Sequence, residues 1–383
     1  MLFRSRGGKP PEPSFRSATA PDGGRLNPAL RSRSVPHIPS LDGFRAISFF
    51  FVYFAHLGVK AIPGAFGVTV FFFLSGYLIT TLMRVEAERM GMPSLKQFYL
   101  RRALRILPPF YIVLLVATSL ACIGFLPGTP AFIPVVMQAL HLSNYWIAIH
   151  GWGGIAEGTG VCWSLAVEEH FYLAFPALFV LLRHMKFTGR QQACVFWGLC
   201  VAVMAWRFAL VLVLHVSTDR TQLCSDTRID SILFGCALAM WNNPALDSVE
   251  PGVGWALQTD VALFAGLAIL VLTFTVRDIS FRETGRYTLQ GMALTPVFVA
   301  AIRRPDRVVF KILNWKPVRF IGTLSYSLYL IHHVALTAVS QHLMLPFPAQ
   351  AAVALGVAFA CAWLMYWIVE APCARLRKKL TPS

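Results

Sequence analysis

The amino-acid sequence predicts an all-α polytopic membrane protein, a bundle of about ten transmembrane helices with both termini cytoplasmic. Of the 383 residues, 56% are hydrophobic and only 14% are charged, and the mean hydropathy is +0.59. These values lie outside the usual range of soluble domains. The apolar residues also gather in runs of roughly 20, the length at which a helix crosses a bilayer.

Ten apolar runs are predicted to span the membrane. They lie at 44–61, 64–83, 107–126, 163–182, 192–214, 229–241, 255–276, 287–302, 320–340 and 349–369. Residues 127–160 are apolar and aromatic but interrupted, so we expect an interfacial or re-entrant segment there. The ten runs leave no room for a separate soluble catalytic domain.

Lysine and arginine are distributed unevenly between the loops, and this sets the expected orientation. They are concentrated before the first run, at 84–105, 183–190 and 303–319, and at 375–379. Ten spans place these segments and both termini on one face of the membrane. By the positive-inside rule that face is cytoplasmic, and Arg277, Arg282 and Arg286 on the other face are the main local exception.

Three parts of the chain are predicted from composition. Residues 1–40 are rich in Pro, Gly, Ser and Arg and are expected to form a disordered basic cytoplasmic arm. Residues 41–373 form the transmembrane domain, and residues 374–383 form a basic cytoplasmic tail. The arm is either a plain solvated tail or an attachment to anionic lipid. Because topology accounts for the net charge of +16, the expected partner is membrane lipid and not nucleic acid.

Arg45 and His56 carry most of the functional information in the first run. Their separation of eleven residues is almost three helical turns, so both side chains lie on one helix face, roughly 16 Å apart. An ionisable side chain inside a bilayer is costly, and it marks a substrate path, a proton relay or a catalytic group. We therefore expect both residues to take part in function.

Glu168 and Glu169 enter the fourth apolar run beside His170. Adjacent helical residues point about 100° apart, so the two carboxylates have different surroundings. One can orient or charge a partner while the other faces a cavity or makes a structural hydrogen bond. His170 is expected to be a packed or interfacial histidine.

Asp226, Arg228 and Asp230 lie where the chain re-enters the membrane from outside. Arg228 between two acids fits an ion-pair network that closes the loop over the helix bundle. It fits equally a group that holds an acceptor hydroxyl or a sugar. Both interpretations are open at this point.

His332 and His333 stand in the ninth apolar run, after a segment rich in serine and tyrosine. One of the two can line a cavity while the other faces a neighbouring helix. Adjacent histidines alone make a poor metal site, and no carboxylate stands at helical spacing to complete one. We therefore predict no metal site.

Arg101, Arg102 and Arg105 precede the third run in an amphipathic cytoplasmic segment. A membrane-surface helix that obeys the positive-inside rule explains most of this charge. Arg101 and Arg105 are also i, i+4 neighbours, a spacing that can present two guanidinium groups to a phosphate.

Eight cysteines are scattered singly, and most are expected to be small core residues. Cys162 and Cys224 both fall near the outer face. They are the pair that can form a disulfide in an oxidising compartment, provided their separation allows it.

Taken in order, these segments carry a set of motifs. They are LDGFRA with the Arg45 and His56 spacing, FFFLSGYLIT at 71–80, FYLRRALRILPPFY at 98–111, WSLAVEEHFY at 163–172, TRIDSILFG at 227–235, SYSLYLIHH at 325–333, and Glu370 with Pro372. Each motif is weak alone. Their collinear occurrence from about Pro39 to Arg375 resembles the acyltransferase-3 family of integral membrane O-acyltransferases, which modify bacterial polysaccharides, lipid-linked sugars and other hydroxyl compounds.

The resemblance implies a chemistry. The donor is an acyl-CoA that enters from the cytoplasm, with acetyl the expected group, and no cofactor is bound permanently. The acceptor is a hydroxyl of a saccharide or glycolipid. The location is the bacterial cytoplasmic (inner) membrane, and polysaccharide-assembly proteins are candidate partners.

The resemblance also implies roles for the singled-out residues. Arg45 at the cytoplasmic mouth is suited to the donor phosphates, with three helpers: Arg101, Arg102 and Arg105. His56 is suited to take a proton from the acceptor hydroxyl as general base. Glu168 or Glu169 orients His56 or stabilises the imidazolium. The acceptor is assigned to three residues: Arg228, Asp230 and His332.

Two alternatives to this reading are kept. A covalent acyl-enzyme through Ser75 competes with direct transfer, although its flanking residues lack a complete G-x-S-x-G elbow, and Ser75 with Gly76 is better explained by close packing on the first helix. A transporter or flippase would use the intramembrane Arg, His and Glu as a substrate or proton path. Some family relatives carry an extra esterase-like domain, so we expect this chain to present its acceptor from the bundle or through a partner.

Overall fold

The computed structural model describes residues 37–248 and 258–379, and within these ranges it contains helices and no strand. This confirms the all-α class. The predicted disordered arm at 1–40 lies outside the described residues except for its last four, where the first helix begins at Pro39. The end of the predicted tail, 380–383, lies outside them as well.

Long helices are interspersed with short ones along the chain. They are α2 (Pro39–His56), α3 (Gly64–Met90), α4 (Leu95–Cys122), α5 (Phe132–Ala139), α6 (Ser143–His150), η1 (Thr159–Val161), α7 (Cys162–His184), α8 (Gly189–Phe208), η2 (Ala209–Val213), α9 (Thr218–Leu223), α10 (Ser225–Met240), α12 (Asp260–Thr275), α13 (Ile279–Glu283), α14 (Arg286–Arg303), α15 (Val308–Asn314), α16 (Lys316–His342), α17 (Phe347–Met365), η3 (Tyr366–Glu370) and α18 (Ala371–Lys379). A helix overlaps each of the ten predicted spans.

Five helical segments of the described chain are long and apolar enough to cross a membrane, which is consistent with an all-α membrane protein. They are Gly64–Met90, Leu95–Cys122, Thr159–His184, Gly189–Val213 and Phe347–Lys379. Helix α12 is apolar but shorter. Helices α2 and α16 fall outside this group because polar and ionisable residues interrupt their apolar runs. That ten helices cross the membrane, with cytoplasmic termini, stays a prediction.

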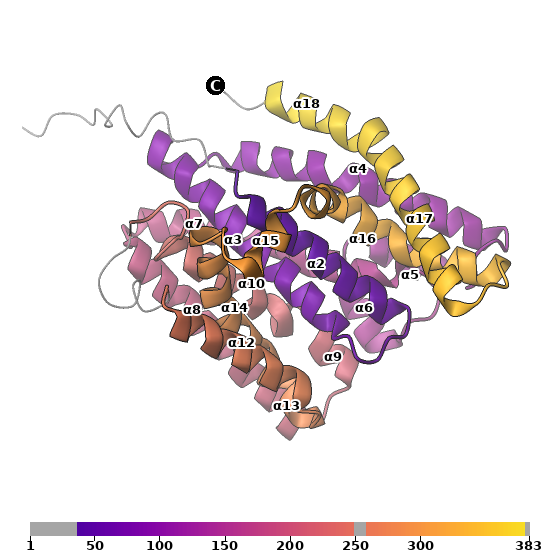
Figure 1. Cartoon of the computed structure of the whole chain (residues 1–383), viewed down its shortest axis with the longest axis horizontal. Helices are drawn as coiled ribbons and strands as arrows, with labels where there is room; N and C mark the ends of the chain where they lie inside the picture. Colours follow the sequence, from indigo (N-terminus) through magenta and orange to yellow (C-terminus); the bar gives the residue numbers. More distant parts are fainter. Residues whose placement is uncertain (1–36, 249–257, 380–383) are drawn as a thin grey trace, which may run out of the picture.

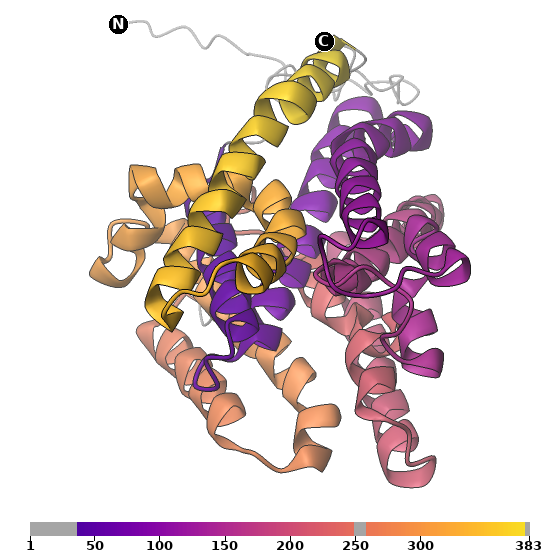
Figure 2. The same cartoon turned by 90° about the vertical axis from the view of Figure 1, so that its right-hand side faces the viewer.

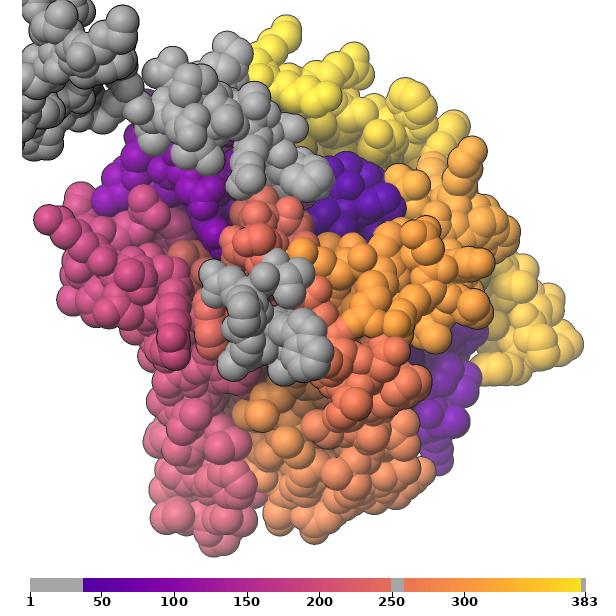
Figure 3. All heavy atoms as spheres, turned by 60° about the vertical axis from the view of Figure 1, so that its left-hand side comes forward, coloured from indigo at the N-terminus to yellow at the C-terminus, as the bar shows by residue number. Residues whose placement is uncertain are grey.

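Helices α2 and α16 form the centre of the bundle. Figure 1 shows α2 in the middle of the molecule, with α4 and α18 at one end and α13 at the opposite end. Helix α2 packs on α3 and α16, α10 packs on α3 and α8, and α17 covers α16. The two central backbones almost touch, because a Cβ atom at Gly322 would lie 1.9 Å from the carbonyl oxygen of Asp42. Figure 3 shows the yellow C-terminal helices on the outside of the bundle.

Glycines also set the crossing of α3 and α10, and here one expectation was wrong. A Cβ atom at Gly76 would lie 1.9 Å from the carbonyl oxygen of Ile232. Gly76 therefore packs on α10, whereas we had expected it to pack on the first helix. The contact with the first helix is made about two and a half turns earlier, where a Cβ atom at Gly67 would lie 2.5 Å from the carbonyl oxygen of Ser48.

The basic segment before the third run is helical, as expected, and it is continuous with that run within α4. Helix α3 continues to Met90, and α4 begins at Leu95, where the Ser94 hydroxyl accepts a hydrogen bond from the Gln97 backbone N–H as a helix cap. The prolines 108 and 109 consequently lie inside α4 and do not start it. This early start places the arginines of α4 beside the bundle.

Residues 127–160 contain two eight-residue helices, α5 and α6, joined by loops. Neither is long enough to cross a bilayer, in agreement with the expected interfacial or re-entrant segment. The loop after α6 turns through Gly154 and Gly158, whose φ angles are +79° and +88°. A Cβ atom at Gly158 would lie 2.7 Å from the backbone of Val334, so this loop is pressed against α16.

Candidate active site

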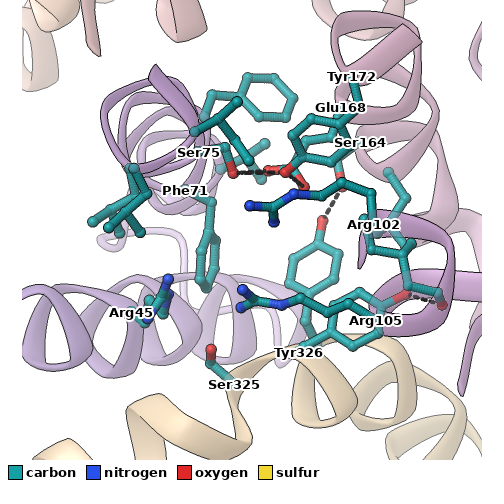
Figure 4. Close-up of a pocket in the computed structure, with 18 of the residues that line it drawn as sticks. Arg45, Phe71, Ser75, Arg102, Arg105, Ser164, Glu168, Tyr172, Ser325 and Tyr326 are labelled. Atoms are coloured by element: carbon teal, nitrogen blue, oxygen red, sulfur yellow. Dashed lines mark hydrogen bonds between the residues drawn. The ribbon is translucent and has the colours of Figure 1, made fainter. Parts of the chain in front are cut away.

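Two cavities adjoin the central helices. The inner cavity lies between α2, α3, α4, α7 and α16, and its polar lining residues are Arg45, Ser75, Arg102, Arg105, Ser164, Glu168, Tyr172, Ser325, Tyr326 and Tyr329. Figure 4 shows the guanidinium groups of Arg102 and Arg105 extending from α4 across the cavity toward the side where Arg45 lies. Residues from five helices therefore converge on one space.

The inner cavity carries an excess of positive charge. Arg45 is held by an ion pair with Asp42, in which Nη1 lies 2.8 Å from Oδ1. Arg102 lies over the ring of Tyr172, 5.5 Å from its centroid. Within the described part of the chain, neither Arg102 nor Arg105 has a carboxylate within ion-pair distance. Guanidinium groups free of acids can bind the oxygen atoms of a phosphate in pairs.

The structure corrects the assignment of Arg101. This side chain donates to Glu86, at 2.6 Å, and is absent from the described lining of the inner cavity. The i, i+4 pair with Arg105 that the sequence suggested is replaced by the i, i+3 pair of Arg102 and Arg105. The reason is helical geometry, because the extended end of α3 brings Glu86 to the face of α4 on which Arg101 lies.

Glu168 belongs to the inner cavity. The Ser75 hydroxyl donates to its Oε1 atom at 2.7 Å, and the Tyr172 hydroxyl donates to its Oε2 atom at 3.2 Å. Glu169 points elsewhere, and its buried Oε1 atom has no hydrogen-bond partner among the described residues. The two neighbouring carboxylates thus have different surroundings, as the 100° step per residue predicts.

The outer cavity contains His56 at the end of α2 and His333 on α16. The loops before α5 and after α6 also line it, with Trp152 and Glu157 among their residues, and Trp163 of α7 lies beside them. The rings of His56 and His333 are stacked, 4.3 Å between centroids and 8° apart in plane. Aromatic faces beside a carboxylate and an imidazole suit a polar, hydroxyl-bearing ligand.

His56 is held by a second histidine. Its Nδ1 atom lies 2.9 Å from the Nε2 atom of His332. The Nδ1 atom of His332 lies 2.8 Å from the carbonyl oxygen of Tyr329 and 3.2 Å from that of Leu328. A carbonyl oxygen only accepts, so Nδ1 of His332 carries the hydrogen and its Nε2 atom accepts from His56. His56 therefore has its hydrogen on Nδ1, and its Nε2 atom is left as a basic lone pair.

Two sequence-based assignments change as a result. The hydrogen-bond partner of His56 among the described residues is His332, so neither Glu168 nor Glu169 orients it directly. His332 itself is 0% exposed and lines neither described cavity, so its observed contact is with His56 and not with either cavity. The reason is that His332 faces the central helix α2, while His333, one residue on, faces the outer cavity.

A thin wall separates the two cavities. The hydroxyl groups of Ser164 and Tyr329, which line the inner cavity, are 2.6 Å apart. Val161 and Trp163, just before Ser164 in the chain, line the outer cavity. The same Tyr329 offers its carbonyl oxygen to His332. The first turn of α7 and one tyrosine of α16 therefore stand between the arginines and His56.

Arg228 and Asp230 lie outside both cavities as described, which corrects their assignment to the acceptor. Arg228 is 1% exposed, donates to the Thr69 hydroxyl at 3.1 Å, and stacks 3.9 Å over the ring of Tyr287. Asp230 forms a fully buried ion pair with Arg207 at 2.7 Å. The alternative network is also wrong, because Arg228 pairs with neither acid.

The remaining acids, histidine and thiols that the sequence singled out have structural surroundings. Asp226 pairs with Arg220, and His170 hydrogen-bonds to the Ser225 hydroxyl at 2.6 Å. Cys162 and Cys224 are both free thiols, so the candidate disulfide is absent from the structure. Among residues 37–248 and 258–379 no group of three or more His, Cys, Asp or Glu is arranged to hold a metal ion.

Fold and site together define an all-α membrane protein with an arginine-lined cavity on one side and a histidine-lined cavity on the other. The family model described as an acyltransferase domain matches residues 38–367, and the chain belongs to this acyltransferase-3 family. The resemblance read from the motifs is thereby confirmed. No solved structure matches the chain.

Curated relatives align with most of the chain. The chain is 30% identical over 349 residues to "Peptidoglycan O-acetyltransferase OatA" of Listeria monocytogenes, covering 88% of this chain and 56% of that protein. It is 30% identical over 319 residues to "O-acetyltransferase OatA" of Staphylococcus aureus, covering 80% of this chain and 52% of the relative. The chain thus spans about half the length of the curated relatives it matches.

Proposed function

We propose that this chain is an O-acetyltransferase of the bacterial inner membrane. It moves an acetyl group from acetyl-CoA to a hydroxyl of a saccharide or glycolipid acceptor. The observation that carries this proposal is the pair of adjoining cavities, one lined by Arg45, Arg102 and Arg105 and the other by His56. Family membership favours a transferase over a transporter that uses the same residues.

The donor occupies the inner cavity. Coenzyme A carries phosphate groups, and the three arginines supply the positive charge and paired donors that phosphates require. By the positive-inside rule the arginine-rich ends of α3 and α4 and the basic helix α18 face the cytoplasm, where acetyl-CoA is made available. Acetyl-CoA enters as a substrate and leaves as coenzyme A.

The acceptor occupies the outer cavity, and His56 is the general base. For the reaction, the acetyl end of the donor passes between Ser164 and Tyr329, which separate the two cavities in this structure. The Nε2 atom of His56 takes the proton of the acceptor hydroxyl while that oxygen attacks the thioester carbonyl. The carbon–sulfur bond then breaks, the thiolate of coenzyme A leaves, and the proton returns to it through the imidazolium of His56. The product is an O-acetyl ester. The similarity to the Listeria relative, which is named as a peptidoglycan O-acetyltransferase, supports a saccharide as the acceptor.

A covalent route through Ser75 is the second candidate mechanism. The observation in its favour is the hydrogen bond of Ser75 to Glu168, which could remove the hydroxyl proton. Against it, Ser75 lines the inner cavity and His56 the outer one, so the general base that we propose does not serve this serine. Direct transfer is the mechanism we propose.

The test is mass spectrometry of surface and secreted glycans. Cells would carry the wild-type chain, a deletion, His56→Ala, or the control His150→Ala, which alters an exposed histidine on α6 outside the described cavity linings. Membrane levels are matched by immunoblot. We expect one acetyl mass to disappear from the same glycan in the deletion and in His56→Ala, and to persist in His150→Ala. An unchanged profile in His56→Ala beside a changed deletion would overturn the role of His56.

A further inference from the structure

An apolar groove lies outside both cavities, on the flank of the bundle. Its walls are α4 and α17 and its floor is α16, and we call it the lateral groove. Representative lining residues are Val116 and Leu120 on α4, Val334 and Ala338 on α16, and Val357 and Cys361 on α17. Figure 2 shows the yellow α17 and the purple α4 on either side of α16.

The lateral groove opens toward the hydrocarbon region of the membrane. Both wall helices belong to segments that are long and apolar enough to span a bilayer. Val116 is 50% exposed and Val357 is 40% exposed, whereas Ala335 on the floor is 4% exposed. All its described lining residues are apolar or cysteine, so the groove offers no strong hydrogen-bond partner. Its natural occupant is a hydrocarbon chain.

The groove borders the outer cavity. Val334 on its floor directly follows His333, and its backbone is pressed against Gly158 of the outer-cavity loop. Ala156 lines the outer cavity and packs in one apolar cluster with Leu120, Val334 and Ala338. A chain lying in the groove would therefore reach the cavity of His56 at its end.

The chemistry of the two substrates indicates which of them carries the hydrocarbon chain that would occupy the lateral groove. An acetyl group has only two carbon atoms, and the rest of acetyl-CoA is polar, so the donor has no use for a long apolar groove. A hydroxyl-bearing head in the outer cavity with its chain in the groove satisfies both surfaces at once. We propose that the lateral groove binds the hydrocarbon chain of a lipid-anchored acceptor and thereby aligns its head group with His56.

This inference rests on the proposed function, and it adds the class of acceptor and a site for its anchor. Bulk lipid competes for any apolar surface in a bilayer, so the groove contributes position more than affinity. The alternative occupant is an ordinary membrane lipid with no part in the reaction. The two cases differ in what a hydrocarbon chain attached covalently in the groove would do. If the groove binds the acceptor, the attached chain inhibits the reaction. If the groove binds only a membrane lipid, the attached chain takes the place of that lipid and the reaction continues.

Cys361 in the groove wall allows this difference to be tested. The other exposed or half-buried thiols (Cys122, Cys194, Cys373) are replaced by serine, and Cys361 is modified in native membranes with hexadecyl methanethiosulfonate or with methyl methanethiosulfonate. Incorporation of radiolabelled acetyl groups from acetyl-CoA is then measured. A matched variant keeps Cys194 on α8 as its exposed thiol and carries Cys361→Ser.

We expect the hexadecyl adduct at Cys361 to reduce incorporation at least tenfold, with recovery after dithiothreitol. The methyl adduct at Cys361 and the hexadecyl adduct at Cys194 should change it less than twofold. Full incorporation with the hexadecyl chain at Cys361 would overturn the groove assignment, as would equal inhibition from Cys194. If the unmodified protein incorporated no acetyl groups, or incorporated them equally well with His56→Ala, the proposed function would be refuted instead. The two failures are therefore distinguishable.

Discussion

The Nδ1 atom of His56 and the Nε2 atom of His332 are 2.9 Å apart, and the second ring is wholly enclosed by protein. The backbone carbonyl of Tyr329 fixes the tautomer of His332, and His332 in turn fixes that of His56. In a serine hydrolase a carboxylate has this orienting role. Here a neutral imidazole has it, and the base keeps its free nitrogen for the acceptor.

His332→Phe is expected to lower acetyl transfer by about 10- to 100-fold, because the ring volume is kept while the acceptor for His56 Nδ1–H is lost. His332→Gln is expected to retain most activity, since its amide oxygen can stand near the position of Nε2. The measurement is acetyl incorporation at saturating acetyl-CoA, with membrane levels matched. Equal activities of the two variants would show that His332 only fills space.

Histidine labelled with ¹⁵N provides a readout that does not depend on catalysis. In the wild-type protein the Nδ1 atom of His56 should have the chemical shift of a protonated nitrogen, and the Nε2 atom that of a bare one. The resonance is assigned by comparison with His56→Gln. The opposite tautomer would contradict the hydrogen-bond direction argued from Tyr329.

The arginines of α4 allow a matched comparison within one helical turn. Arg102→Ala or Arg105→Ala should raise the KM for acetyl-CoA by about 10- to 100-fold, the range for losing a hydrogen bond between charged groups. Arg101→Ala should leave this KM nearly unchanged, because Arg101 pairs with Glu86 outside the cavity. Steady-state kinetics in membranes measure both. A larger effect from Arg101 than from Arg102 would contradict the assignment of the donor site.

Ser75→Ala separates direct transfer from an acyl-enzyme. Ser75→Ala removes the hydrogen bond that Ser75 donates to Glu168 and the longer one that it accepts from the Tyr172 hydroxyl at 3.2 Å. Direct transfer predicts a loss of about fivefold or somewhat more, because a hydrogen bond contributes roughly 1 kcal/mol. An acyl-enzyme predicts complete loss together with a labelled protein after acid quenching of the wild type with [¹⁴C]acetyl-CoA. If the wild-type protein is labelled and the Ser75→Ala variant is not, the acyl-enzyme mechanism replaces direct transfer.

Sequence periodicity predicted what depends on one helix at a time. The apolar runs each overlap a helix, and the step of 100° per residue separated Glu168 from Glu169 correctly. The same step explains why Arg45 and His56 could be singled out on α2. These features follow from local geometry, which the order of residues contains directly.

Contacts between side chains on different helices could not be predicted in this way. The pairing of Asp230 with Arg207 and of His56 with His332 joins residues far apart in the chain. Which of Arg101 and Arg102 faces the bundle depended on where α4 begins, and the cap at Ser94 that fixes this start is a weak local signal. A single sequence therefore gave the types of side chain at the site but not their contacts.

The crossing of α3 and α10, like that of α2 and α16 at Gly322, is expected to tolerate no larger residue. At Gly76 a Cβ atom would lie 1.9 Å from the carbonyl oxygen of Ile232, and at Gly235 it would lie 2.1 Å from that of Phe73. Both obstacles are backbone atoms, which cannot rotate away as a flexible side chain can. Gly76→Ala must therefore push the two helices apart, at a cost of about 1 to 3 kcal/mol or more for overpacking.

Gly198→Ala on α8 provides the control, because no heavy atom lies within 4 Å of its added Cβ. Alanine in a helix interior is favoured over glycine by about 0.5 to 1 kcal/mol, so this variant should be as stable as the wild type or more stable.

The measurement is thermal unfolding in detergent, in which the soluble fraction left after heating is quantified by size-exclusion chromatography. Gly76→Ala should unfold at a lower temperature than the wild type, and activity should fall with the folded fraction because Ser75 beside it lines the inner cavity. If Gly76→Ala unfolds at the wild-type temperature, the two helices do not cross as closely as their glycines indicate.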